Sequence, residues 1–132
     1  MAIDYGLKRT GLAVTDPLKI IANPLETVAS NELLIFLTAY IRKEEVECIV
    51  VGDPRNLDNT PAQISGEVNR MVETLRKTFP GITVKTIDER FTSKIAQQTI
   101  LASGVNKKRR RDKSLVDKIS AVIILQSFLE TI

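Results

Sequence analysis

The chain has 132 residues, of which 43% are hydrophobic, 27% charged and 5% aromatic, with a formal net charge of +3. This length and composition predict one folded domain with an aliphatic core and exclude a disordered tail. The lack of histidine excludes Ser-His catalysis and the usual zinc sites, and the single cysteine excludes an internal disulfide. No apolar run is long enough to span a bilayer, so we expect a cytoplasmic protein that makes no membrane contact.

The first part of the chain predicts four strands and a helix. The first is a short strand in which Ala2 and Ile3 run into Asp4–Gly6, and the others cover residues 10–15, 25–28 and 48–51. The first two are expected to form a hairpin, and the third to be an edge strand that follows a loop containing Pro24. Ser30 and Asn31 offer a helix cap before an apolar-rich helix that ends near Lys43. The β-branched fourth run, which contains Cys48, is typical of a strand buried on both faces.

The second part predicts helices and one more strand. These elements cover residues 61–79 (helix), 82–87 (strand), 92–104 (short helix) and 115–129 (last helix). The first of them has apolar residues at helical spacings, and Pro80 and Gly81 end it. The last helix is apolar around most of its circumference and is expected to pack inside the protein. The order of elements predicts a single α/β domain with a mixed sheet.

Four carboxylates lie far apart in the chain, where a fold could bring three together as ligands for Mg²⁺ or Mn²⁺. Asp4 ends the first strand, at the kind of position where open sheets place ligand-binding groups, although a turn-forming role is the alternative. Asp88 and Glu89 close the last strand. Neighbours in a strand face opposite sides, and alternation cannot decide between the two at the end of a strand. Arg90 could instead pair with one of these acids at the surface.

The fourth carboxylate, Asp117, aligns on the last helix with Ala121, Ile124 and Phe128 at 100° per residue. A carboxylate on an apolar face is costly unless it is paired or binds a metal ion. The alternative is that Asp117, in the first turn after Ser114, complements the helix dipole and reaches water. The sequence therefore favours a metal site that includes Asp117 without excluding this second role.

Positive charge is concentrated just before the last helix. The segment 107–113 carries six cations and one acid, and these cations are Lys107, Lys108, Arg109, Arg110, Arg111 and Lys113. Such a cluster is typical of a phosphate-backbone contact site, and a solvated loop is the alternative. Further candidate substrate contacts are Arg9, Arg55 and Arg90. With few aromatic residues for base stacking, recognition is expected to rest on phosphates and strand shape, and to weaken with added salt.

Four separated motifs, taken together, resemble the YqgF/RuvX family over essentially the whole chain. The motifs are Asp4–Gly11, Val50–Pro54, Asp88–Ser93 and Val116–Ala121. The resemblance implies a single ribonuclease H-like nuclease domain over residues 1–132 with a five-stranded mixed sheet, related to RuvC-type Holliday junction resolvases. It also implies a nuclease that trims the 5′ end of pre-16S rRNA with a metal-binding and catalytic triad of Asp4, Glu89 and Asp117. Asp53 stands where an apolar residue is common, so whether Asp53 or Asp88 joins the site stays open.

The sequence leaves several functions and partners to compare. The substrate could be precursor rRNA, as free RNA or within ribosomal precursor particles, or branched DNA cut by a symmetric dimer. A catalytically silent RNA-binding factor for ribosome assembly is a second alternative. A nucleotide-phosphate loop of the actin-fold ATPase kind would need a second domain, for which 132 residues leave no room. We expect a monomer or a weak dimer.

Overall fold

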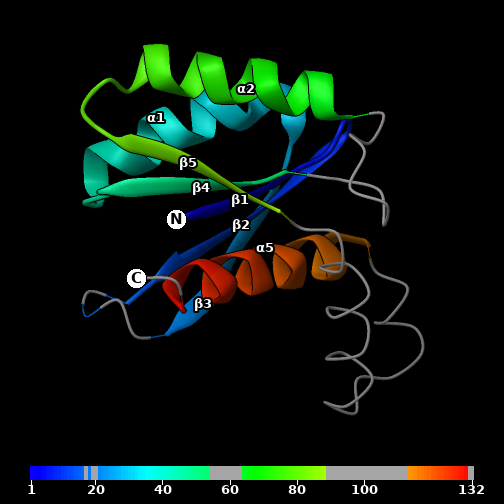
Figure 1. Ribbon diagram of the computed structural model, residues 1–132, viewed down its shortest axis with the longest axis vertical. Helices are drawn as coiled ribbons and strands as arrows, with labels where there is room; N and C mark the ends of the chain where they lie inside the picture. The colour runs from blue at the N-terminus through cyan, green and yellow to red at the C-terminus, as the bar shows by residue number, and fades with distance from the viewer. Residues whose placement is uncertain (17, 19–20, 54–63, 89–112, 131–132) are drawn as a thin grey trace.

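The computed structural model describes residues 1–16, 18, 21–53, 64–88 and 113–130. Its core is a five-stranded mixed sheet with the strand order β3-β2-β1-β4-β5. Helices α1 and α2 cover one face of the sheet and helix α5 covers the other (Figure 1). The predicted α/β fold with a five-stranded mixed sheet is therefore confirmed.

The strands divide into an antiparallel and a parallel part. They are β1 (Ala2–Tyr5), β2 (Arg9–Thr15), β3 (Ala22–Ala29), β4 (Cys48–Asp53) and β5 (Thr83–Asp88). Strands β1, β2 and β3 form an antiparallel meander, whereas β4 and β5 run parallel to β1. The carboxyl ends of β1, β4 and β5 therefore meet at one edge of the sheet, the edge where open α/β sheets bind ligands.

The helices follow the predicted pattern closely. They are the short 3₁₀ helix η1 (Ser30–Glu32), α1 (Leu33–Lys43), α2 (Ser65–Thr78) and α5 (Lys113–Leu129). The helix predicted for residues 92–104 and the predicted start of α2 at Pro61 lie outside the described residues. Among the described helices, none combines the length and the apolar character that crossing a membrane requires.

Alternation along the strands separates two apolar cores. Ile3 and Val51 pack toward α1 and α2, where Leu37 and Leu75 are fully buried. On the other face, Ala121, Ile124 and Leu125 of α5 pack against side chains of the central strands. Those strand residues include Ala2, Ala13 and Val50. Because successive side chains of a strand face opposite sides, Asp4 lies on the α5 face of the sheet.

Two local predictions for the first part of the chain are wrong. Ser30 does not cap a helix, since neither η1 nor α1 begins with a side-chain cap hydrogen bond. Its hydroxyl instead donates to the carbonyl oxygen of Gly6, at 2.5 Å, because the tertiary contact with the hairpin replaces the local one. Pro24 lies within β3 and not in a loop, paired with Ala13. An edge strand tolerates proline because its outer side needs no N–H donor, and the register shifts beside this pair.

Helix α5 lies very close to β2 at Gly11. A Cβ atom on Gly11 would overlap the backbone carbonyl carbon and oxygen of Asp117. Gly11 pairs with Asp4 across the β1–β2 ladder. The missing side chain of Gly11 thus lets the helix carry Asp117 down onto the strand pair that holds Asp4.

We predict that Gly11→Ala destabilises the protein by about 1 to 3 kcal/mol, because the added methyl must push the α5 backbone away from the sheet. Gly66→Ala is the matched control, since a Cβ there meets only the end of the Arg70 side chain, at 3.7 Å. In helix α2 that change should leave the free energy of unfolding unchanged or raise it by up to about 1 kcal/mol. Chemical denaturation measures both variants, and equal stability of Gly11→Ala and wild type would contradict the prediction.

Candidate functional site

Asp4 lies at the carboxyl edge of the sheet and has a perturbed pKa. It lies near the end of the central strand β1, between β2 and β4, and faces α5. Burial, and to a smaller extent the negative charge of Asp117, together raise the pKa of Asp4 from its ordinary value of 3.8 to about 7. The ionised form of Asp4 is therefore disfavoured unless a positive charge lies beside it.

Asp117 reaches the same place from helix α5. It lies one turn before Ala121, which is fully buried against the sheet, and its own side chain is only 21% exposed. The Nε atom of Arg9 donates a hydrogen bond to Oδ2 of Asp117 at 2.9 Å. Asp117 thus faces the sheet and is partnered by a side chain from β2, which a carboxylate that only complements a helix dipole would not need.

The carboxylate oxygens of Asp4 and Asp117 are ligands of the kind that suits a divalent cation. Two carboxylates close enough for their charges to repel are held on one face of a sheet, and Arg9 partners Asp117. Oxygen ligands of this kind suit Mg²⁺ or Mn²⁺. Within the described ranges no group of three or more Asp, Glu, Cys or His side chains is close enough to hold a metal ion. The third member of the predicted triad, Glu89, lies outside those ranges.

Asp88 and Asp53 face the other way. They pair with each other at the ends of β5 and β4, and each lies an even number of residues from a side chain in the α1 and α2 core, Val84 for Asp88 and Val51 for Asp53. Alternation therefore directs both carboxylates toward that face, opposite to Asp4. Ile87, in contrast, packs toward α5. This distinction was open at the sequence level because the sequence does not say which face of β5 carries the site.

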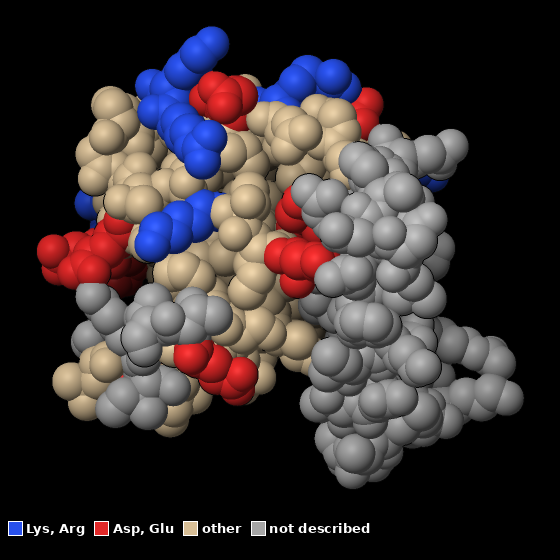
Figure 2. All heavy atoms as spheres, in the orientation of Figure 1, with Lys and Arg blue, Asp and Glu red and all other residues tan. Residues whose placement is uncertain are grey.

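The predicted substrate contacts are described only in part. Arg9 lies on β2, with its side chain 41% exposed, and Lys113 is the first residue of α5. The others lie outside the described residues, and they are Arg55, Arg90, Lys107, Lys108, Arg109, Arg110 and Arg111. In the view of Figure 2, described Lys and Arg side chains gather mainly in the upper part of the molecule, where α1 and α2 lie, while acidic side chains are scattered over the top, the centre, the left edge and the lower part. The predicted basic interface therefore depends on the segment before α5.

Sequence reasoning missed the residues that brace the site. Buried Thr10 and Ser30 share a hydrogen bond of 2.8 Å between their hydroxyls, and the backbone N–H of Ser30 donates to the carbonyl oxygen of Lys8 at 3.0 Å. Together with the bond to Gly6, these contacts fix the turn that leads from Asp4 to Arg9. The available signal was the hydroxyl of Thr10, which alternation places on the same side of the strand as Leu12 and Val14.

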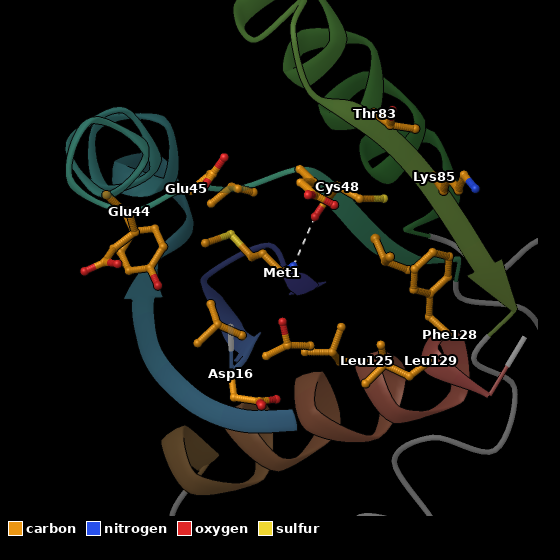
Figure 3. A pocket seen from close by; sticks show the side chains of 16 residues that line it. Met1, Asp16, Glu44, Glu45, Cys48, Thr83, Lys85, Leu125, Phe128 and Leu129 are labelled. Atoms are coloured by element: carbon orange, nitrogen blue, oxygen red, sulfur yellow. Dashed lines mark hydrogen bonds between the residues drawn. The ribbon is translucent and has the colours of Figure 1, made fainter. Parts of the chain in front are cut away.

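A cavity in the described part of the protein lies away from this site. It has a volume of about 670 Å³, and the amino ends of three strands line it through Met1, Cys48 and Thr83. Figure 3 shows the amino group of Met1 donating a hydrogen bond to the carbonyl oxygen of Cys48, at 3.0 Å. Since Asp4 and Asp117 lie toward the carboxyl ends of the parallel strands, the cavity is not where the candidate chemistry is placed.

Comparisons with known proteins agree with the motifs. A family model described as "RuvX: Holliday junction resolvase" matches residues 1–131. A protein of Christiangramia forsetii is 50% identical over 129 residues, which are 98% of this chain and 96% of that protein. A protein of Phocaeicola vulgatus is 52% identical over 131 residues, covering 99% of this chain and 94% of its own. Both are named "Putative pre-16S rRNA nuclease". The match over nearly its whole length shows that this chain belongs to the RuvX family, as its four motifs predict.

Proposed function

We propose that this protein is a metal-dependent nuclease that hydrolyses phosphodiester bonds in precursor 16S rRNA, in the cytoplasm, and so takes part in ribosome biogenesis. The observation that carries the proposal is the partly buried Asp4 held beside Asp117 at the carboxyl edge of the sheet. A repulsive pair of this kind is unfavourable in a purely structural role. The names of the relatives support the RNA substrate.

The ligands of the metal ion would be Asp4, Asp117 and Glu89. Asp4 and Asp117 come from the described strand and helix, and Glu89 follows β5 directly. If the extended backbone of β5 continued, positions 87 and 89 would share one face of the strand. Ile87 packs toward α5, so the carboxylate of Glu89 would then face the same side as Asp4. Bound Mg²⁺ or Mn²⁺ would supply an activated water and would stabilise the leaving oxygen of the phosphodiester.

Cationic side chains of the protein would bind the phosphates of the substrate. Lys113 begins α5 four residues before Asp117, so the basic segment 107–113 ends about 6 Å along the helix axis from the site. Phosphates bound by this segment would lie close to the carboxylates. Arg9, partly exposed beside Asp117, would hold a phosphate at the other side of the site.

A second candidate substrate is a four-way DNA junction, which the description of the matching family favours. The same carboxylates would serve, because hydrolysis of a phosphodiester does not depend on the sugar. A comparison of cleavage on precursor rRNA and on a synthetic DNA junction, at equal protein concentration, distinguishes the two substrates. Faster cleavage of the junction would replace the RNA assignment.

We predict that Asp4→Asn, Glu89→Gln and Asp117→Asn each lower the cleavage rate by on the order of 100-fold or more, because each removes a charged metal ligand worth several kcal/mol in the transition state. The matched control is Asp88→Asn, which changes a neighbouring acid on the opposite face and should retain most of the activity. The assay uses precursor rRNA with Mg²⁺ or Mn²⁺. Equal residual cleavage in all four variants would attribute the activity to a contaminant and reject the assignment.

We also predict a pH-dependent gain in stability for Asp4→Asn in the metal-free protein. The folded-state pKa of Asp4 is raised to about 7 from 3.8, so folding takes up a proton between these values and wild type becomes less stable as pH rises through that window. The variant lacks this penalty. Its advantage should be absent below pH 3.8, grow up to about pH 7, and reach on the order of 4 kcal/mol above it.

Denaturation in EDTA at a series of pH values measures this difference, and a constant offset between the two proteins would contradict it. Adding Mg²⁺ at pH 8 should then stabilise wild type, because a ligand that binds only the folded state raises its stability. The same addition should have a smaller effect on Asp4→Asn, which lacks one of the proposed ligands.

A further inference from the structure

The turn that joins β1 to β2 carries an exposed leucine beside the candidate site. Residues 6–8 connect the two strands, and the side chain of Leu7 is 68% exposed. Lys8, next to it, is also exposed. Leu7 follows Asp4 by three residues and precedes Arg9, the partner of Asp117, by two. An exposed apolar side chain thus lies in the chain between Asp4 and two cations, Lys8 and Arg9.

Hydrogen bonds from Ser30 hold this turn in place. The carbonyl oxygens of Gly6 and Lys8 accept hydrogen bonds from the hydroxyl and the backbone N–H of Ser30, at 2.5 and 3.0 Å. Ser30 is in turn hydrogen-bonded to the fully buried Thr10. A braced turn loses little conformational entropy when its tip meets a partner, which favours binding.

Exposure alone does not distinguish Leu7, because single apolar side chains are common on protein surfaces. Leu18, Ile21 and Ile35 are also exposed among the described residues. Leu18 and Ile21 lie beyond the other end of β2, and Ile35 lies on α1. What sets Leu7 apart is its place in the turn that follows β1, the strand that carries Asp4.

In the described part of the protein, no aromatic side chain is left free of the two cores to stack on a nucleic-acid base. Those described all pack against one of the two cores, and they are Tyr5, Phe36, Tyr40, Phe79 and Phe128. Proteins that lack exposed rings can still grip a stacked nucleic acid by inserting an aliphatic side chain between base steps, which unstacks and kinks it. Leu7 has the size, the exposure and the neighbouring cations for such a wedge.

We propose that Leu7 inserts between stacked bases of the RNA at the end of a duplex next to the scissile phosphate, while Lys8 contacts an adjacent phosphate. This inference rests on the proposed nuclease function and adds a specificity-determining residue to it. The wedge recognises a junction between paired and unpaired RNA, since stacked bases must be present for the side chain to separate them. Leu7 therefore contributes to the choice of the cleavage position.

The test uses a synthetic RNA hairpin with a 5′ single-stranded extension and 2-aminopurine, whose fluorescence rises on unstacking, at the junction. The full-length protein is added with Ca²⁺ in place of Mg²⁺. Wild type should increase the fluorescence several-fold, and Leu7→Ser should lose most of the increase. Leu7→Ser should also bind the hairpin about 10-fold more weakly, as expected for losing most of the burial of one leucine, yet bind single-stranded RNA of equal length as wild type does.

Two matched variants complete the experiment. Leu18→Ser changes a similarly exposed leucine roughly 20 Å away, past the other end of β2, and should behave as wild type. Leu7→Met should retain the fluorescence increase, because it keeps a large apolar side chain. An equal increase with Leu7→Ser, or equal weakening on hairpin and single strand, would overturn the insertion. Failure of wild type to bind or cleave any RNA would overturn the proposed function as well.

Discussion

The arrangement of the site depends on one close approach between backbones. Helix α5 lies against β2 where Gly11 has no side chain, and any larger residue there would meet the carbonyl group of Asp117. Gly11 is also the ladder partner of Asp4. A single missing side chain thus sets the height of the helix above the sheet and brings two carboxylates, separated by 113 positions in the chain, within range of mutual repulsion.

The sheet supplies the rigid frame for this contact. Its central strands are buried on both faces, and Ile49, Val50 and Val51 are at most 1% exposed. Burial stabilises the folded state by on the order of 2 kcal/mol for each of these side chains. This gain outweighs the repulsion between two carboxylates that have a guanidinium beside them. The fold can therefore hold Asp4 and Asp117 together without a bound ion, at a cost that appears in the raised pKa of Asp4.

Local patterns in the sequence predicted most of this frame. The strand at 48–51 and the helix that became α2 were recognisable because β-branched runs and helical spacing of apolar residues follow directly from burial. The errors at Ser30 and Pro24 have a common reason, because each residue was interpreted from its neighbours in the chain. Ser30 instead bonds to Gly6, 24 positions away, and Pro24 is tolerated by its place at the edge of the sheet. The contact between Gly11 and Asp117 was likewise beyond local reasoning.

The charges of the site explain why a cation and Arg9 have different roles. Asp4 and Asp117 carry two negative charges when ionised, and Arg9 offsets one of them through its contact with Asp117. Asp4 is left as the acid that holds its proton near neutral pH. With Glu89 as the proposed third ligand, the site would keep a net charge of −2, which one divalent ion would balance. Binding of that ion would displace the proton of Asp4, so metal affinity and pH would be coupled through the same side chain.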